Sequence, residues 1–543
     1  MKRREIVGKI ACLASGFFFL NEATARADKK QLPDDQSASF QPVYDVRKYG
    51  ATGNGKTNDA AAIQKAIDTC SKNGGGIVQL DNGTFLSGGI SFKSNVELHL
   101  TSTAILLGSP DLSTYNKDKK STFGEPSRSF IYAADCHHIA LTGTGKIDGQ
   151  GHLFKSDSTY SVRPLLIQLR DSQDLRINDL LLTNSAVWAC WLLHCERVKV
   201  NGVRIDNPIS PNRDGIDIDG CREVLISNCN IKTEDDSIAF KVSRKGQPTR
   251  DVVITNCLLS SRCAAIRFGP DAIDNIENVT VSNCVIRDTK LNGIKIQESM
   301  GGSMRNITFS NIVMENTRGP ISIRLAGWKL PEGEAAPFEI NDSNWENGKL
   351  QNILFDNIRA STPKDNIAMS ITGTTKTRPQ QLTFSNIDFS FTGGGTAEQG
   401  ARRNVPDMDR DYPEMYIFGE LPAYGLYIHH ASGIVLNNVQ FRLDSEDLRP
   451  AVVCDDVIDL ELSGFKVDGS KNAESAIRLQ NSQHVYINHS RATNDIGTFV
   501  RVEGTKSRDI LIEGNKLNFA AKIFEITADV AAGAVVSANN YIS

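Results

Sequence analysis

The octapeptide VLISNCNI at residues 224–231 returns along the chain at a nearly constant interval. Its next copies are VVITNCLL (252–259), VTVSNCVI (279–286) and ITFSNIVM (307–314), followed by ILFDNIRA (353–360), LTFSNIDF (382–389) and IVLNNVQF (434–441). Asparagines in register occur at Asn201, Asn228, Asn256, Asn283 and Asn311, at steps of 27, 28, 27 and 28 residues, and later at Asn357, Asn386 and Asn438. A fixed period in this range is typical of a solenoid rather than of a string of globular domains.

Each copy alternates apolar and polar residues, which is the period of a β-strand. Asparagine suits the turn because its side chain bonds nearby backbone and tolerates left-handed geometry. Short strands that repeat in one direction, coil after coil, predict an all-β protein: a single-stranded, right-handed parallel β-helix. A β-propeller is a poorer match because it needs about 40 residues or more per repeat.

Three segments depart from the repeat. Residues 59–70 (DAAAIQKAIDTC) have helical periodicity, with Ile63, Ala66 and Ile67 on one face. They are predicted to form an N-terminal helical cap, within residues 40–90, over an otherwise open sheet edge. Insertions at residues 328–350 and 393–413 are too long for simple turns. Each is interpreted either as a wall of a binding groove or as a surface excursion.

Residues 1–27 have the features of an export signal. A basic start (residues 2–4) precedes an apolar stretch (10–20), and Ala-Arg-Ala at 25–27 fits a small-x-small cleavage site. The predicted mature domain is therefore residues 28–543, located in the periplasm or outside the cell. The pair Arg3-Arg4 is compatible with a twin-arginine route and with ordinary secretion. No other segment is apolar and long enough for a membrane span.

The composition limits the partners and the redox chemistry. A formal net charge of -4 gives no global indication of nucleic acid or an anionic membrane surface as a partner. Ten of the 11 cysteines follow the signal, enough for five disulfides in an oxidising compartment. Cys229, Cys257 and Cys284 instead occupy equivalent repeat positions, so we expect a stack of small buried side chains. The cysteines and histidines show no zinc-finger-like spacing.

The repeat places three aspartates on one patch. In DGIDI (214–218) and DSIAF (236–240) the isoleucines must face the core, so Ile216 aligns with Ile238. This alignment puts Asp214 next to Asp236 on strands about 4.8 Å apart, with Asp235 one position earlier. Like charges at such a distance raise one another's pKa.

A carboxylate cluster of this kind is what glycoside hydrolysis requires. One carboxylic acid protonates the leaving oxygen while another carboxylate activates water. Crowding supplies the raised pKa that keeps the acid protonated near neutral pH. A solvated acidic edge or a calcium site is the alternative for these residues.

The same outward face carries a column of cations. With the isoleucine pairs of later coils facing inward, the intervening positions are Arg267, Lys295 and Ser322, and the next outward positions include Lys241 and Arg324. Lys241, Arg267, Lys295 and Arg324 are therefore predicted to bind an anionic sugar chain. Charge balancing of the aspartates is the alternative. Trp191, one coil upstream, is placed either to stack on a sugar ring or to be covered.

At these residues the sequence resembles glycoside hydrolase family 28, the polygalacturonases and their relatives. The motifs that carry the resemblance are YDVRKYGA (44–51), NDAAAI (58–63), GTGKIDGQG (143–151), SPNRDGIDI (210–218) and EDDSIA (234–239). The resemblance implies inverting hydrolysis of pectic glycans, of the galacturonan or rhamnogalacturonan type, with no metal and no cofactor. It implies Asp235 as the general acid, Asp214 and Asp236 as the residues that hold and deprotonate water, and Asn212 as a substrate-binding residue.

Two positions depart from the family pattern. Cys263-Ala264-Ala265 stands where the family has Gly-His-Gly, and Lys295-Ile296-Gln297 stands where Arg-Ile-Lys grips the substrate carboxylate. Either Arg267 or Arg324 takes over that grip, or the preferred sugar is not a plain galacturonate. A branched pectic oligosaccharide such as a rhamnogalacturonan fragment is therefore favoured over unsubstituted polygalacturonan, and the insertions would suit an exo-acting pocket.

Two other functions are compatible with the same scaffold. A polysaccharide lyase would abstract a proton next to a uronate carboxylate, give unsaturated products and often need calcium. A non-catalytic glycan-binding solenoid would account for the missing histidine but not for the three aspartates.

Overall fold

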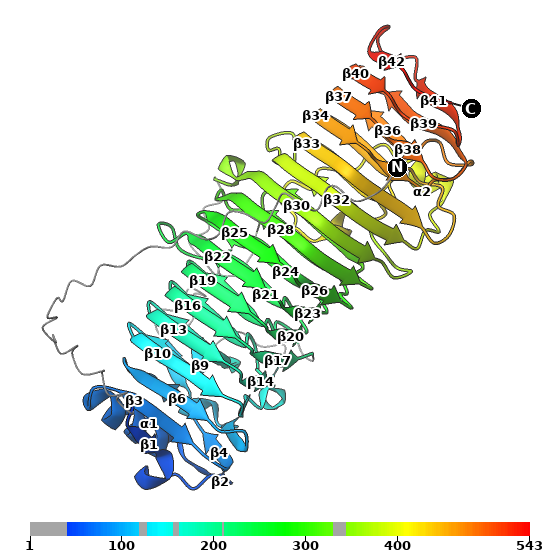
Figure 1. The fold of residues 1–543 in the computed structure, drawn as a ribbon. Helices are drawn as coiled ribbons and strands as arrows, with labels where there is room; N and C mark the ends of the chain where they lie inside the picture. Colours follow the sequence, from blue (N-terminus) through cyan, green and yellow to red (C-terminus); the bar gives the residue numbers. More distant parts are fainter. Residues whose placement is uncertain (1–40, 119–126, 156–161, 209–210, 330–343, 543) are drawn as a thin grey trace, which may run out of the picture. The chain divides into compact units, whose positions relative to one another are not determined.

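The computed structural model describes residues 41–118, 127–155, 162–208, 211–329 and 344–542. The predicted signal at residues 1–27 lies outside the described residues, as does most of the predicted insertion 328–350. From Pro42 onward the chain forms one compact unit built almost entirely of parallel strands. In Figure 1 the strands follow one another in sequence order along a single axis.

Successive coils add their strands to three parallel stacks, which confirms the predicted single-stranded, right-handed parallel β-helix. The stack that will matter for function, called here the site stack, comprises β5 (Ile90–Ser91), β9 (Ser127–Ala134), β12 (Leu165–Arg170), β15 (Cys190–Leu193), β18 (Ile216–Asp219), β21 (Ile238–Val242), β24 (Ala264–Ala272), β27 (Asn292–Glu298), β29 (Gly319–Leu325), β31 (Met369–Thr372), the starts of β33 (Leu426–Leu443) and β34 (Val452–Ser463), β36 (Ile477–Gln480), β39 (Ile496–Glu503) and β41 (Ala520–Ile526).

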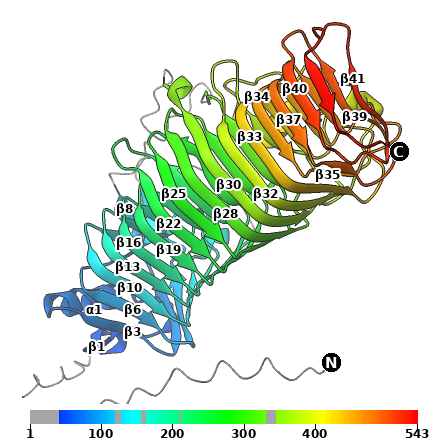
Figure 2. The same cartoon turned by 45° about the horizontal axis from the view of Figure 1, so that its top comes forward.

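The other two stacks complete each coil, and several late strands bend from one stack into the next. One comprises β1 (Val43–Asp45), β3 (Gly76–Leu80), β6 (Val96–Leu100), β10 (His137–Gly143), β13 (Gln173–Asn178), β16 (Glu196–Asn201), β19 (Arg222–Ser227), β22 (Thr249–Thr255), β25 (Ile276–Ser282), β28 (Ser303–Glu315), β30 (Lys349–Ser361), β32 (Gln380–Phe391), parts of β33 and β34, β37 (Gln483–Asn488), β40 (Arg508–Glu513) and β42 (Val535–Ala538). The other comprises β2 (Asn54–Asn58), β4 (Gly83–Ser87), β7 (Ala104–Gly108), β11 (Lys146–Asp148), β14 (Leu181–Thr183), β17 (Arg204–Asn207), β20 (Asn230–Thr233), β23 (Leu258–Ser261), β26 (Val285–Arg287), the ends of β28, β30, β32 and β33, β35 (Lys466–Val467) and β38 (Arg491–Ala492). Figure 2 shows strands such as β16, β19, β22 and β25 side by side.

Like side chains stack on one another inside the coils. The rings of Phe240 and Phe268 are parallel with centroids 4.1 Å apart, and Phe309 and Phe355 repeat the arrangement at 5.0 Å. Such rows remove apolar surface from water continuously along the axis, so each coil stabilises its neighbours. The predicted cysteine stack belongs to this core. The ten cysteines of the described chain are all free, and nine of them are buried.

The asparagine row forms a ladder on the outside of the turns. Asn228 donates from Nδ2 to Oδ1 of Asn201 at 2.8 Å, and Asn311 donates in the same way to Asn283 at 3.2 Å. Asn228 and Asn311 have φ of 57° and 54°, the left-handed conformation that asparagine tolerates. The ladder is interrupted where Asn283 donates to the hydroxyl of Thr255 instead.

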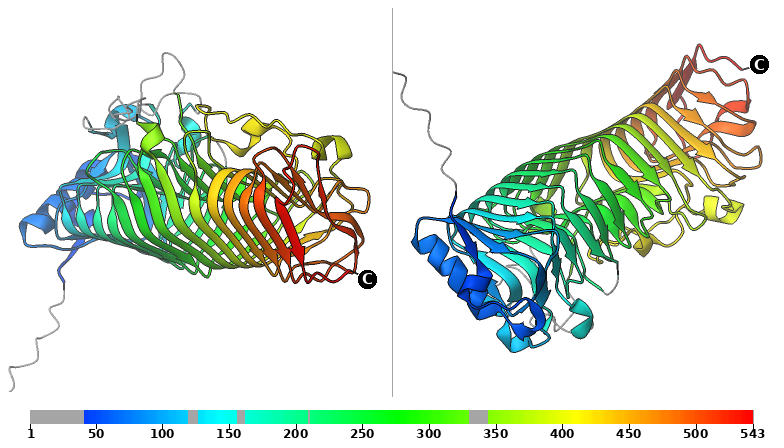
Figure 3. Two further views of the ribbon diagram at one scale, coloured as in Figure 1. Left: turned by 90° about the horizontal axis from the view of Figure 1, so that it is seen from above. Right: turned by 60° about the horizontal axis from the view of Figure 1, so that its bottom comes forward.

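The predicted helix is present as α1 (Ala60–Lys72), and it buries Ile63, Ala66, Ile67 and Cys70. It packs beside β1 and β3, as Figure 3 shows. Its role as a cap of the solenoid stays a prediction. The antiparallel strand β8 (Asn116–Asp118) and the short helices η1 (Val46–Tyr49), η2 (Leu112–Thr114), η3 (Gly151–Leu153), η5 (Trp345–Asn347), α2 (Ala397–Gly400) and η6 (Met415–Phe418) complete the described elements. Across these described ranges, every helix is too short or too polar to cross a membrane.

Candidate active site

The three aspartates lie at the entrances of two neighbouring strands in the site stack. β18 and β21 pair with Ile216 opposite Ile238, as the sequence predicts. Just before these strands, the amide of Gly215 donates to the carbonyl oxygen of Asp236 at 2.9 Å. Asp214 and Asp236 therefore occupy equivalent positions on adjacent coils, and Asp235 directly precedes Asp236.

The adjacent residues Asp235 and Asp236 have opposite electrostatic environments. Burial, and then the neighbouring charge of Asp236, raise the pKa of Asp235. Burial also acts to raise the pKa of Asp236, but Arg267, Lys295 and Lys241 outweigh it and the pKa is lowered. One carboxyl is thus biased toward the acid and its neighbour toward the carboxylate, the division that acid–base catalysis requires.

Two donors hold the Asp236 carboxylate. The amide of Ala264 donates to Oδ1 at 3.1 Å, and Nη1 of Arg267 donates to Oδ2 at 3.1 Å. Cys263 lies beside both aspartates: its sulfur and one oxygen of each carboxyl are mutually within 4.8 Å. The Cys263-Ala264-Ala265 segment therefore supports Asp236 through a backbone amide at the place where the family pattern has a histidine.

Asp217 joins the cluster, although sequence reasoning did not select it. It is fully buried between Ile216 and Ile218 and pairs in register with Ala239. Burial raises its pKa well above the usual range, while Lys241 opposes the shift. The alternation that placed Arg267 outward also places Asp217 outward, so the same rule could have found it.

Lys241 lies among the carboxylates as predicted, but it already has partners. Its Nζ is 3.3 Å from Asp271 Oδ2 and 3.8 Å from Asp217 Oδ1. The ring of Trp188 lies 4.8 Å from the same nitrogen. Burial and the nearby Asp217 and Asp235 contribute to an Asp214 pKa well above its usual range, and Lys241 opposes that shift as well.

Arg267 and Lys295 are adjacent in the outward column, in the predicted register, but both are covered. Nζ of Lys295 donates to the two carboxylate oxygens of Glu414 at 2.9 and 2.7 Å. Arg267 donates from Nη2 to the hydroxyl of Tyr412 at 2.8 Å and to Oε1 of Gln297 at 3.1 Å. Lys295 is 0% exposed and Arg267 is 5% exposed.

The covering residues come from the end of the predicted insertion 393–413 and the residue after it. Glu414 directly precedes η6, Tyr412 lies two residues earlier, and Gln297 also donates to the carbonyl of Pro413. The ring of Trp328, at the start of the other insertion, packs edge-on against Tyr412 at 5.1 Å. The later insertion therefore lies against the cation column of the site stack.

Three other predicted residues have partners within the protein or are covered. Arg324 contacts the carbonyl of Asp407 at 3.0 Å and the Thr372 hydroxyl at 3.4 Å. Asn212 accepts a hydrogen bond from Arg163 at 3.1 Å and has a left-handed φ of 59°. Trp191 is fully buried, so the covered alternative holds for this ring.

Comparison with known proteins defines the family. The model of glycosyl hydrolases family 28 matches residues 70–407, which is more than half of the chain. The chain belongs to this family. The sequence resemblance is therefore confirmed.

The family 28 relatives have modest identity. A probable polygalacturonase of Vitis vinifera is 30% identical over 297 residues, covering 50% of this chain and 60% of the relative. The endo-polygalacturonase of Pectobacterium carotovorum subsp. carotovorum is 25% identical over 406 residues, covering 70% and 94%. The match thus spans 60% of the length of the grape relative, and likewise 60% of a probable polygalacturonase of Arabidopsis thaliana.

A solved structure supports the fold. The hyperthermoactive exopolygalacturonase of Thermotoga maritima superimposes with a TM-score of 0.55 at 22% identity, covering 66% of this chain and 88% of that one. At this identity the similarity establishes the β-helix alone. Tyr412 and Glu414 lie beyond residue 407, where the family match ends, and no periodic pattern in the sequence indicated that they would meet Arg267 and Lys295.

Proposed function

We propose that this protein is an inverting glycoside hydrolase that cleaves glycosidic bonds in pectic polysaccharides or oligosaccharides. Asp235 is the general acid, Asp236 deprotonates the attacking water, and Asp214 helps to hold that water. The observation that carries the proposal is the convergence of three carboxyls, with Asp214 and Asp236 equivalent on adjacent coils, Asp235 directly before Asp236, and Asp236 held by Arg267 and the Ala264 amide. Family membership and the names of the polygalacturonase relatives support a pectic substrate.

The reaction proceeds as a single displacement in this proposal. Asp235 donates its proton to the glycosidic oxygen as the bond to the anomeric carbon breaks. Water attacks that carbon from the opposite face, and its proton passes to Asp236. Arg267 and the Ala264 amide keep Asp236 ionised before the step, which makes it an available base.

The sugar next to the cleaved bond is not a plain galacturonate in this proposal. Glu414 neutralises Lys295, and Gln297 is uncharged where the family pattern has a lysine. Arg267 is engaged by Asp236 and Tyr412. A substrate carboxylate would have to compete with Glu414 for its cation, so a rhamnogalacturonan-type oligosaccharide is the favoured substrate.

Exo action is proposed on a separate observation. The segment containing Tyr412 and Glu414 lies over Arg267 and Lys295, and a binding surface covered at that point accepts a chain end more readily than a chain interior. Products from a long polysaccharide distinguish the modes, because exo action releases one small product from the first minutes of reaction.

The test is a panel of defined galacturonan and rhamnogalacturonan oligosaccharides with products followed by NMR. We expect inverted anomeric configuration and, for Asp235→Asn, a kcat lower by roughly 10²–10⁴-fold. Asp509→Asn, a change at an exposed carboxylate, is the matched control. Full turnover by Asp235→Asn would exclude the assigned acid. Ultraviolet-absorbing unsaturated products would indicate a lyase, and tight binding without turnover would indicate a binding solenoid.

Export is part of the proposal. The basic start, the apolar stretch and the Ala-Arg-Ala sequence at 25–27 support cleavage after residue 27. N-terminal sequencing of protein recovered outside the cytoplasm should begin at Asp28. Replacement of Arg3 and Arg4 by lysine should block export only if the twin-arginine route is used.

A further inference from the structure

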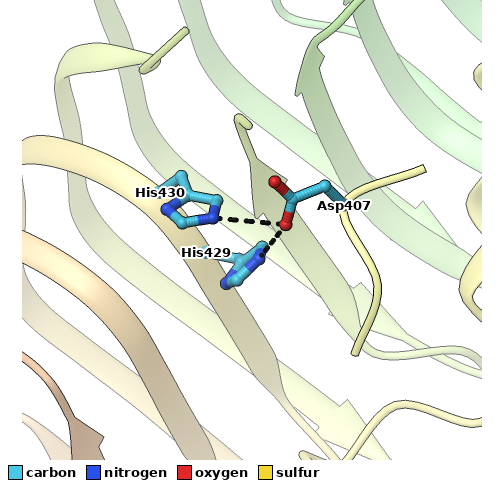
Figure 4. Close-up of side chains that lie close together, drawn as sticks. All are labelled: Asp407, His429 and His430. Atoms are coloured by element: carbon cyan, nitrogen blue, oxygen red, sulfur yellow. Dashed lines mark hydrogen bonds and ion pairs between the residues drawn. The ribbon is translucent and has the colours of Figure 1, made fainter. Parts of the chain in front are cut away.

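Two neighbouring histidines and an aspartate from a distant segment converge outside the carboxylate cluster. Oδ1 of Asp407 lies 2.9 Å from Nε2 of His429 and 3.2 Å from Nε2 of His430. Figure 4 shows both rings directed at that oxygen. Successive residues of a strand normally point to opposite faces, but His430 has a φ of 49°, and this left-handed bend brings both rings to the same side.

The remaining polar atoms of these three side chains lie close to other groups of the protein. Oδ2 of Asp407 accepts a hydrogen bond from the amide of Thr375 at 3.1 Å. Nδ1 of His429 lies 3.2 Å from Asp455, and Nδ1 of His430 lies 2.5 Å from Asp456. An imidazole with a carboxylate behind it is the usual outer arrangement of a metal-ligating histidine, because the carboxylate fixes the tautomer and orients the ring.

The two imidazole rings make more contacts with carboxylates than their N–H groups can serve when both rings are neutral. The two rings make four nitrogen–carboxylate contacts, whereas two neutral imidazoles supply two N–H groups, so either further protons or a cation must supply the rest. Nδ1 of His430 is hydrogen-bonded to Asp456, whereas Nδ1 of His429 is 3.2 Å from Asp455 without a hydrogen bond. In the neutral tautomer with its proton on Nδ1, each ring presents a lone pair from Nε2 to Asp407. Two lone pairs and a carboxylate oxygen aimed at one point are satisfied together by a cation.

We propose that Asp407, His429 and His430 bind a zinc ion. Two imidazole nitrogens and one carboxylate oxygen are a ligand set that zinc accepts, with water in the fourth position. Bonds of about 2.0–2.1 Å in a tetrahedron require ligand atoms about 3.3 Å apart, close to the observed separations from Oδ1. The Asp407 side chain retains 24% exposure, which gives water access to the fourth position.

The ion would fasten the insertion to the coils. Asp407 belongs to the insertion, and the two histidines belong to β33. Arg324 holds the carbonyl of the same aspartate at 3.0 Å, and the covering residue Tyr412 follows five positions later. Zinc at this point therefore has a positioning role for the segment that covers the cation column, and takes no part in bond cleavage.

Zinc titration of the chelator-treated full chain tests the site, with a chromogenic chelator as competitor. We expect one zinc ion per chain for the wild type, and loss of that ion in His429→Gln and in the double variant His429→Gln/His430→Gln. Asp455→Asn, which alters the carboxylate behind a ligand, should weaken binding by roughly 10–100-fold. The matched control is His137→Gln/His138→Gln, because these are also adjacent histidines in contact, with Nδ1 atoms 2.9 Å apart.

The outcomes divide cleanly. Absence of stoichiometric zinc in the wild type overturns the site, and so does wild-type affinity in folded His429→Gln or Asp455→Asn, with folding checked by circular dichroism. Limited proteolysis of the wild type tests the fastening role, and we expect zinc to protect residues 401–414. Zinc that binds without protecting this segment overturns that role. These readouts need no activity, so they are independent of the proposed hydrolysis.

Discussion

Replacing Glu414 by glutamine should release the insertion from the cation column. Lys295 is fully buried, and its Nζ contacts both oxygens of Glu414, whose side chain is only 5% exposed. Glutamine keeps the size of the side chain but removes its charge. The variant therefore leaves a buried ammonium without its main counter-ion.

The burial and the remaining contacts of Lys295 determine how much free energy the Glu414→Gln substitution costs. Removing one partner of a buried ion pair costs about 3–5 kcal/mol. Lys295 keeps a contact to Cys263 Sγ at 3.5 Å and the favourable charge of Asp236, so the lower end of that range applies. A loss of about 3 kcal/mol makes opening of the segment more frequent by roughly a hundredfold.

Hydrogen exchange measured by mass spectrometry reports that opening directly. Amides of Ile417 and Gly419 are protected by hydrogen bonds to carbonyls of Glu414 and Tyr416, at 3.2 and 3.1 Å. Peptides covering residues 405–420 should exchange roughly a hundred times faster in Glu414→Gln. Exchange at the wild-type rate would refute the view that this ion pair holds the segment.

Two further variants separate charge from packing. Glu346→Gln breaks the exposed pair with Lys376, where both side chains are about half exposed, and should leave these peptides unchanged. Lys295→Met combined with Glu414→Leu removes both charges. It should restore much of the protection, since a buried pair is often replaceable by apolar residues of similar size.

Two other predictions concern catalysis and the solenoid. The plot of kcat/KM against pH should be broad: activity falls as pH rises through the raised pKa of Asp235, which must be protonated, and falls as pH drops through the lowered pKa of Asp236, which must be ionised. The shifts would be contradicted if the acidic and the basic limb of this plot both gave pKa values in the ordinary range of carboxyl groups. Asn311→Ala should lower the free energy of unfolding by roughly 1–3 kcal/mol, because alanine disfavours its φ of 54° and the bonds to Asn283 and Asn357 are lost. Asn311→Gly, which tolerates that φ, should cost less in the same urea titration.

The sequence predicted the coils well because their information is local and repeated. Alternation fixed which residues face inward, and matching Ile216 with Ile238 gave the register that β18 and β21 adopt. The same matching placed Arg267 beside Lys295 correctly. The sequence did not predict long strands such as β28 and β33, which continue from one stack into the next. Whether pairing continues through the turn between two stacks depends on the neighbouring coils rather than on the octapeptide itself.

The candidate site was predictable only where it follows the coils. The repeat brought Asp214, Asp235 and Asp236 together, and the same rule extends to Asp217. The sequence placed the cations on the correct face. It did not show that they are covered, because their partners Tyr412 and Glu414 come from a segment without periodicity. Such a segment is positioned by a few long-range contacts, and these cannot be inferred from a local sequence pattern.

This difference has a consequence for specificity. A solenoid coil is held on both sides by its neighbours, so the carboxylates proposed as catalytic have little freedom to move on its face. The segment over that face is held instead by discrete polar contacts: Asp407 with its histidines, Arg324 with the Asp407 carbonyl, and Glu414 with Lys295. Altering one of these contacts changes what covers the cation column without disturbing the coils. Substrate preference should therefore respond to substitutions in residues 405–414 while the acid–base chemistry of Asp235 and Asp236 stays the same.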